Sequence, residues 1–208
     1  MRQRIFFVLA CVVALAAWAA PRDEMPNLIP NEGFEDGVPD PWVFYGQVAF
    51  AMANRNDAYE GTEALQITVA AAGVNFWDSG VQYRGAGQPL VFEQGVTYTW
   101  AFFMKADHPV NVNIKPELAQ DPWTGYGERQ VLVTEEYQEF WTTWQTPQDV
   151  IPAQLTLHVA FDAATLWMDA PRWYEGEYIP YEEWIGEVPQ AVNPVGKLTV
   201  TWGALKGR

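Results

Sequence analysis

Short runs of alternating apolar and polar residues, separated by turn residues, constrain the fold of this chain more than any other feature. Leu65, Ile67 and Val69 alternate with Gln66 and Thr68, a period of two that places the two sets on opposite faces of a strand. Comparable runs occupy residues 98–105, 110–118, 130–134, 139–146, 155–161 and 166–168. Clusters of glycine, proline and asparagine separate them at short spacing. We therefore predict an all-β fold, an antiparallel β-sandwich rather than parallel βαβ units.

The first 19 residues have the pattern of a secretory signal peptide. Arg2 and Arg4 precede an apolar run at residues 5–17, which is too short for a comfortable transmembrane helix. Small residues before position 20 fit cleavage after Ala19. Lipidation at Cys11 and a retained anchor are the alternatives. We expect a secreted, periplasmic or cell-surface protein.

Charge excludes several kinds of partner. The chain has 12 basic and 26 acidic residues, so removing Arg2 and Arg4 leaves 10 basic residues and a net charge of −16. This charge repels phosphate backbones and anionic lipid, so we expect no nucleic acid and, after signal cleavage, no membrane as partner. Cys11 is the only cysteine. Stability must therefore come from the core, with a bound metal ion as a candidate addition, and not from disulfides.

Five stretches occur in an informative order along the chain. They are NLIPNEGFEDG (27–37), AYEGTEALQITV (58–69), FWDSGVQY (76–83), GVTYTWAFFMKAD (95–107) and LWMDAPRWYEG (166–176). Together they resemble carbohydrate-binding modules of families 4, 9, 16 and 22, which accompany xylanases and glucanases. The resemblance implies a jelly-roll sandwich that binds a β-linked glycan, and many such modules hold a structural calcium ion.

The predicted organisation has three segments. A signal peptide at residues 1–19 precedes the carbohydrate-binding-module-like sandwich at residues 20–176. Residues 177–208 form a tail rich in proline and acidic residues, interpreted as a linker or a strap across the surface. The run at residues 197–202 is a candidate edge strand within this tail.

The resemblance also implies a calcium site. It places Glu35, Asp169 and the backbone carbonyls around Glu60 and Glu63 at the family's calcium positions. Calcium takes six to eight oxygens from carboxylates and carbonyls, so the ion would tie the N-terminal segment to the last strand. The alternative is that Glu35 and Asp169 are solvated turn residues. In one departure from the family pattern, Ala170 follows Asp169 where a second acid is usual.

The loop at residues 120–129 combines turn residues with large rings. Pyranose rings present flat C–H patches fringed by hydroxyls, so sugar sites favour aromatic platforms beside amides and carboxylates. We predict that Trp123 and Tyr126 are platforms and that Glu117 and Gln120 are hydrogen-bonding groups. The alternative for Trp123 is a lid over the sandwich edge.

Three further residues are candidates for sugar contact. Trp77 and Gln82 lie in the stretch FWDSGVQY, where members of the resembled families often carry sugar-contacting residues. Alternation places His158 on the strand face opposite Leu155 and Leu157. Each has a plainer alternative: core packing for Trp77, a solvent-facing strand position for Gln82, and a sheet position without a ligand for His158.

No catalytic arrangement is recognisable in the sequence. Sandwich-fold glucanases carry closely spaced acids along one strand, and no predicted strand here has them. The two histidines, His108 and His158, fall on different predicted elements. We therefore predict an exported, non-catalytic module that recognises a neutral poly- or oligosaccharide. The alternative is a surface or matrix adhesion protein that uses the same calcium-stabilised sandwich without binding sugar.

Overall fold

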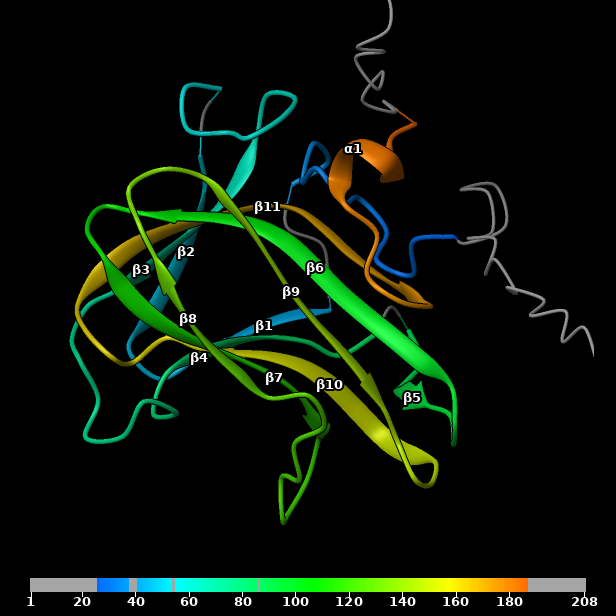
Figure 1. Cartoon of the computed structure of the whole chain (residues 1–208). Coiled ribbons are helices and arrows are strands. Elements are labelled where there is room, and N and C mark those ends of the chain that lie inside the picture. The colour runs from blue at the N-terminus through cyan, green and yellow to red at the C-terminus, as the bar shows by residue number, and fades with distance from the viewer. Residues whose placement is uncertain (1–25, 38–40, 54, 86, 187–208) are drawn as a thin grey trace, which may run out of the picture.

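Two antiparallel sheets pack face to face in the computed structural model, which describes residues 26–37, 41–53, 55–85 and 87–186 (Figure 1). Sheet A contains, in spatial order, β1 (Trp42–Tyr45), β4 (Gly80–Tyr83), β10 (Val150–His158), β7 (Val110–Leu118) and β8 (Arg129–Val133), with β5 (Leu90–Phe92) paired to β10. Sheet B contains β2 (Val48–Ala53), β3 (Ala64–Val69), β11 (Ala164–Glu175), β6 (Thr97–Ala106) and β9 (Gln138–Gln145). A short helix, α1 (Tyr181–Trp184), follows the last strand.

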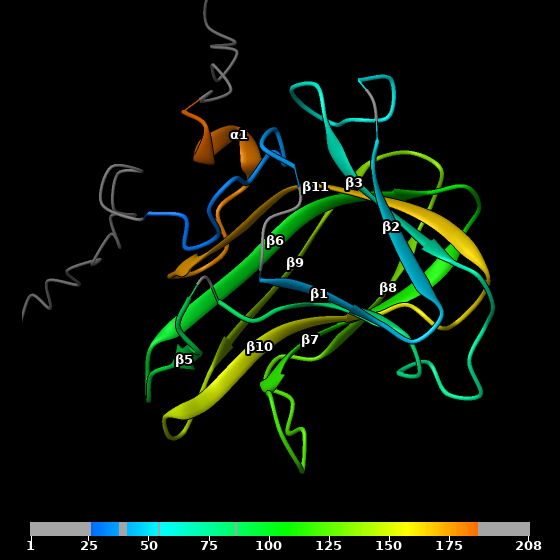
Figure 2. The ribbon, with the colours of Figure 1, turned by 180° about the vertical axis from the view of Figure 1, so that it is seen from behind.

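The chain crosses repeatedly between the layers, and its strands pair antiparallel within each sheet. For example, β6 lies in sheet B, β7 and β8 in sheet A, β9 in sheet B, β10 in sheet A and β11 in sheet B. The two layers are visible from both sides of the molecule (Figures 1 and 2). The prediction of an all-β, jelly-roll sandwich is confirmed.

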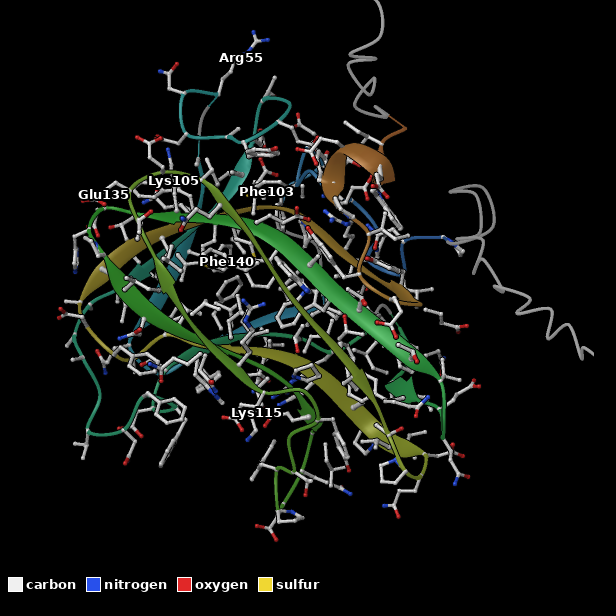
Figure 3. All side chains as sticks on the ribbon, in the orientation of Figure 1. Arg55, Phe103, Lys105, Lys115, Glu135 and Phe140 are labelled. Atoms are coloured by element: carbon white, nitrogen blue, oxygen red, sulfur yellow. The ribbon has the colours of Figure 1, made fainter. Side chains whose placement is uncertain are left out.

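Strand alternation builds the core between the sheets. On β6 the side chains of Tyr98, Trp100 and Phe102 are buried in this core, whereas Phe103 belongs to a second cluster on the other face of sheet B. Phe140 of β9 lies between the layers (Figure 3). Each large apolar side chain removed from water contributes about 1.5–3 kcal/mol, which explains how a domain without disulfides is stable.

The outer face of sheet B is covered by the chain that follows β11. Tyr181 and Trp184 of α1 pack with Phe103 and Tyr174 over this face, and Figure 1 shows the helix above the sheet. The described part of the predicted tail, residues 177–186, therefore packs on the sandwich. Residues 187–208, with the candidate edge strand, and the predicted signal peptide lie outside the described residues.

Candidate functional site

The outer face of sheet A, on the side away from sheet B, carries a cavity of about 560 Å³. Strands β4 and β7 both pair antiparallel with β10, so the three lie side by side beneath it. Core side chains such as Val81, Ile114 and Leu157 are fully buried between the sheets. Because side chains alternate along a strand, the residues between them point outward and form the cavity floor.

The register of these strands arranges the floor in rows that cross the sheet. His158 lies opposite Asn113. Thr156 lies between Gln82 on one side and Lys115 on the other, and Gln154 lies opposite Glu117. Successive rows are two residues apart along each strand, or about 6.6 Å. The floor is therefore a regular polar array in the middle of a β-sheet.

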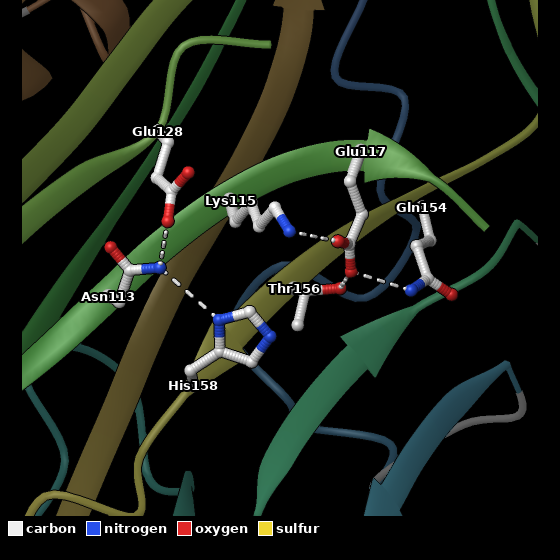
Figure 4. A network of polar contacts seen from close by, with 7 residues as sticks. All are labelled: Asn113, Lys115, Glu117, Glu128, Gln154, Thr156 and His158. Atoms are coloured by element: carbon white, nitrogen blue, oxygen red, sulfur yellow. Dashed lines mark hydrogen bonds and ion pairs between the residues drawn. The ribbon is translucent and has the colours of Figure 1, made fainter. Parts of the chain in front are cut away.

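Glu117 is the centre of the larger hydrogen-bond network on this floor, and it is only 2% exposed (Figure 4). Gln154 Nε2 donates to Glu117 Oε1 at 2.8 Å, and Thr156 Oγ1 donates to the same oxygen at 2.6 Å. Lys115 Nζ lies 2.9 Å from Glu117 Oε2. These partners compensate the buried charge, since an unpaired carboxylate in this position would be strongly destabilising.

A second network joins His158 to the loop before β8. Asn113 Nδ2 lies 3.2 Å from His158 Nδ1 and donates to Glu128 Oε1 at 2.9 Å (Figure 4). Burial lowers the pKa of His158 from its ordinary value, and the neighbouring charge of Glu117 opposes that shift. The ring is therefore neutral near pH 7, with Nδ1 as the acceptor for the Asn113 amide.

Two tryptophan rings border the floor. Trp77, on the loop before β4, is 51% exposed, and Trp123, on the loop after β7, is 45% exposed. Since β4 and β7 run in the same direction, a ring that precedes β4 and a ring that follows β7 lie at opposite ends of the cavity along the strand direction. Both rings line the cavity. Phe76 supports this border through a stacked contact with Phe161 at 5.1 Å.

The structure brings five of the seven predicted sugar-contacting residues to this cavity. They are Trp77, Gln82, Glu117, Trp123 and His158. Gln120 is exposed on the following loop and does not line the cavity. Tyr126 is half-buried against the hydrophobic core and is not in the lining, so its ring is held away from the position predicted for a platform.

Several residues at the cavity were missed in the sequence. Tyr45, Phe76, Arg84, Lys115 and Glu128 line it, and Asn113, Gln154 and Thr156 support the lining through hydrogen bonds. Alternation along β7 and β10 was a usable signal, because it puts Asn113, Lys115 and Glu117 on one face. Arg84 gave no such signal, because it follows a four-residue strand that contains glycine.

The four predicted calcium ligands lie around the loop at residues 59–63. Glu35 Oε1 accepts hydrogen bonds from the Thr62 and Glu63 amides at 2.7 and 3.0 Å. The fully buried Asp169 accepts bonds from the backbone amides of Tyr59, Glu60 and Ala170. Burial raises the pKa of Asp169 to about 7.

The donor set has the oxygen chemistry that calcium prefers, but its geometry fits only in part. A β-carbon placed on Gly33 would lie 3.9 Å from both Glu35 Oε1 and Glu60 Oε1, so both carboxylates lie beside Gly33. Asp169 is already occupied by three amides. Within the described ranges, no three His, Cys, Asp or Glu side chains form a group that could hold a metal ion. Calcium binding therefore stays a prediction.

A two-sheet jelly roll with a ring-bordered, polar-floored cavity on one sheet is the architecture of a carbohydrate-binding domain. The family model described as a carbohydrate binding domain, which joins module families 4 and 9, matches residues 26–165. The chain belongs to this family and is a carbohydrate-binding module. No curated protein sequence matches the chain.

Solved structures agree on the fold. A CBM4 domain is 24% identical, with a TM-score of 0.55 over 70% of this chain and 98% of that chain. The N-terminal cellulose-binding domain of Cellulomonas fimi β-1,4-glucanase C is 22% identical, with a TM-score of 0.53 over 77% of this chain and 100% of that one. The CBM22-1 xylan-binding domain of Paenibacillus barcinonensis Xyn10C is 15% identical, with a TM-score of 0.54 over 71% and 94%.

Proposed function

We propose that the cavity on sheet A binds a poly- or oligosaccharide, with β-linked glycans as the expected class. The observation that carries the proposal is the position of Trp77 and Trp123, two half-exposed rings that border one polar floor. Exposed rings that gather around one concave surface are a feature of ligand-binding sites. The rings supply flat apolar surface for the C–H faces of a pyranose, and the floor supplies groups for its hydroxyls.

The floor is suited to this role because its polar groups are already held in place. Among the lining residues, Gln82 accepts a hydrogen bond from Arg84, and Glu128 and His158 are both bonded by Asn113. Groups that are ordered before binding lose little conformational entropy when the ligand arrives, so more of the contact energy appears as affinity. Burial also raises the pKa of the Tyr45 hydroxyl at the cavity wall, which keeps it a neutral hydrogen-bond donor.

Binding is tested by calorimetric titration of the domain with oligosaccharides from β-glucan, xylan, mannan and galactan. We expect one class to bind, and we expect Trp77→Ala and Trp123→Ala each to weaken that binding by about tenfold or more, as aromatic anchors of interfaces do. Phe50→Ala is the matched control, because Phe50 is 53% exposed on β2 of sheet B. Absence of binding to every class would favour an adhesion role instead.

We propose that the domain binds its glycan without hydrolysing it. Glycoside hydrolysis requires two carboxyl groups free to exchange a proton or attack the sugar. The oxygens of Glu117 are engaged by Gln154, Thr156 and Lys115, so this residue is held as a structural anion. Release of reducing ends from the bound oligosaccharide would contradict the proposal.

Export and calcium are separate proposals. No helix in the part of the chain described here is long and apolar enough to cross a membrane. The basic and apolar pattern of residues 1–19 supports export with cleavage of a signal peptide, which mass spectrometry of the secreted chain would test. The position of the Glu35 and Glu60 carboxylates beside Gly33 supports a calcium ion next to the 59–63 loop.

A further inference from the structure

Arg84 stands where two cavities meet. It lines the ring-bordered cavity, and it also lines a neighbouring cavity of about 450 Å³. The second cavity includes Gly85, Gln88 and Ala119 and extends past the end of β4 toward Pro152. A glycan long enough to leave the first cavity at this side would therefore pass over the guanidinium group.

Neutral groups hold the Arg84 guanidinium. Its Nε donates to Gln154 Oε1 at 3.2 Å, and one terminal nitrogen donates to Gln82 Oε1. An arginine has five N–H donors in a fixed planar fork, so two bonds of this kind fix its orientation and leave donors for a ligand. Amide oxygens carry no net charge, so the full positive charge of Arg84 remains.

The neighbouring ionic groups do not cancel this charge. Gln154 also donates to Glu117, so it links the cation to the anion, but Glu117 already forms an ion pair with Lys115 at 2.9 Å. The lining holds two cations, Arg84 and Lys115, and two anions, Glu117 and Glu128, and the one ion pair among these four residues joins Lys115 to Glu117 and does not involve Arg84. Among the described residues, no acid lies within ion-pair distance of Arg84.

We propose that the glycan bound in this cavity carries a carboxylate, as a uronic acid unit or substituent does, and that Arg84 binds it at the junction of the two cavities. This inference rests on the proposed function. A planar guanidinium pairs with a carboxylate through two parallel hydrogen bonds, a match that a hydroxyl does not offer. The rings and the rest of the floor bind the uncharged part of the chain.

The attraction is local to Arg84. The chain as a whole has a formal net charge of −14, so its long-range field opposes an anionic ligand. Glu128, the other acid in the lining, belongs to the separate network with Asn113 and His158. Discrimination in favour of a carboxylate must therefore come from the position that Arg84 occupies.

The test uses pairs of oligosaccharides that differ by one carboxylate. One pair is xylotetraose with and without a glucuronic acid substituent. The other is cellotetraose and its counterpart oxidised at one C6 position. Calorimetry is carried out in about 0.15 M salt, where charges about 8 Å apart are already largely screened in solvent. We expect the acidic member of the pair that binds to bind about tenfold tighter, the factor for one charge-assisted bidentate contact.

Variants identify the residue responsible. Arg84→Gln should remove the preference for the acidic member, measured as the ratio of the two affinities within the variant, whereas Arg84→Lys should retain part of the preference. Arg55→Gln makes the same change in net charge on an exposed loop, which Figure 3 places far from Lys115 on the cavity floor. It should leave the preference unchanged. Melting temperatures of the three variants confirm that they are folded.

The outcomes separate this inference from the proposed function. Equal binding of both members by the wild-type domain would overturn the role of Arg84 while keeping glycan binding. An equal loss of preference in Arg84→Gln and Arg55→Gln would also overturn it, because the effect would then be general electrostatics. Failure of all four oligosaccharides to bind, together with the polysaccharide panel above, would overturn both.

Discussion

Gln154 and Glu117 face one another across strands β10 and β7, and the Gln154 amide donates a 2.8 Å hydrogen bond to the Glu117 carboxylate. Both side chains are almost completely buried. Through Lys115 and Arg84 the same pair connects to both cations of the cavity. The carboxylate of Glu117 thus organises a floor that a neutral residue of the same size would not hold together.

Glu117→Gln should therefore lower the free energy of unfolding by about 2–3 kcal/mol, the range for losing hydrogen bonds to a charged group. The new amide removes the countercharge of Lys115 and places an N–H donor near Gln154 or Thr156. Urea denaturation measures the change. In a double-mutant cycle with Lys115→Met, the two losses should be smaller together than in sum. Additive losses would show that the ion pair contributes nothing.

His158 should make stability depend on pH. Because burial lowers its pKa in the folded state, the unfolded chain takes up a proton first as the pH falls. Its contribution is complete above about pH 6.5, the value of a free histidine, and is lost as the pH falls from there through the lowered pKa. The melting temperature of the wild type should drop more between pH 7.5 and 5 than that of His158→Asn, which keeps an acceptor for Asn113. Parallel pH profiles for the two proteins would rule this out.

Arg172 on β11 is 1% exposed and pairs with Glu139 of β9 beneath α1. Glu139→Ala should lower the free energy of unfolding by about 3–5 kcal/mol, because it leaves a buried charge without its partner. Glu136→Ala, an exposed position close by in the chain, should change it by less than about 0.5 kcal/mol. Similar effects of the two substitutions in chemical denaturation would mean that the pair is not essential.

Tyr126 should affect stability and not ligand binding. Its ring is half-buried against the core, so Tyr126→Ala should lower the free energy of unfolding by about 1–3 kcal/mol, less than a fully buried aromatic ring. The folded variant should bind glycan as the wild type does. A tenfold loss of affinity without loss of stability would instead support the platform that the sequence predicts at this position.

Calcium should raise the melting temperature of the domain, and a chelator should lower it, if the ion ties Glu35 of the N-terminal segment to the 59–63 loop. A site of this charge is expected to prefer calcium to magnesium, which dehydrates reluctantly. Glu35→Gln should abolish the calcium-dependent part of the shift. Identical melting temperatures in calcium and in chelator would contradict a calcium site, and the loop would then be held by its hydrogen bonds to Glu35 and Asp169.

The sequence predicted the sandwich because β3, β6, β7 and β9 alternate cleanly over six or more residues. It did not single out β1, β2, β4 and β5. Three of these have only three or four residues, and β2 reads Val-Ala-Phe-Ala-Met-Ala without a polar alternate. Such strands are specified by pairing with long neighbours rather than by their own pattern.

Residue type alone was enough to single out some of the residues that line the cavity, whereas the position of others depends on the path of the chain. Trp77 and Trp123 stand out as large rings in turns, and both reach the cavity. Tyr126 has the same signal, yet it turns inward, because only the path of the loop decides which ring faces solvent. Arg84 lies just after a short strand, and its place in the site is visible only from its contacts with Gln82 and Gln154 at neighbouring positions of the sheet.

The position of α1 on the outer face of sheet B affects how the domain should be immobilised for binding measurements. Helix α1 packs over sheet B on one side of the sandwich (Figure 1), whereas the cavity lies on the outer face of sheet A. A domain fixed to a sensor chip or a bead through a residue of α1 would therefore present the cavity to the solution. A domain fixed through the outer face of sheet A would have its cavity against the support, where a ligand in solution could not reach it.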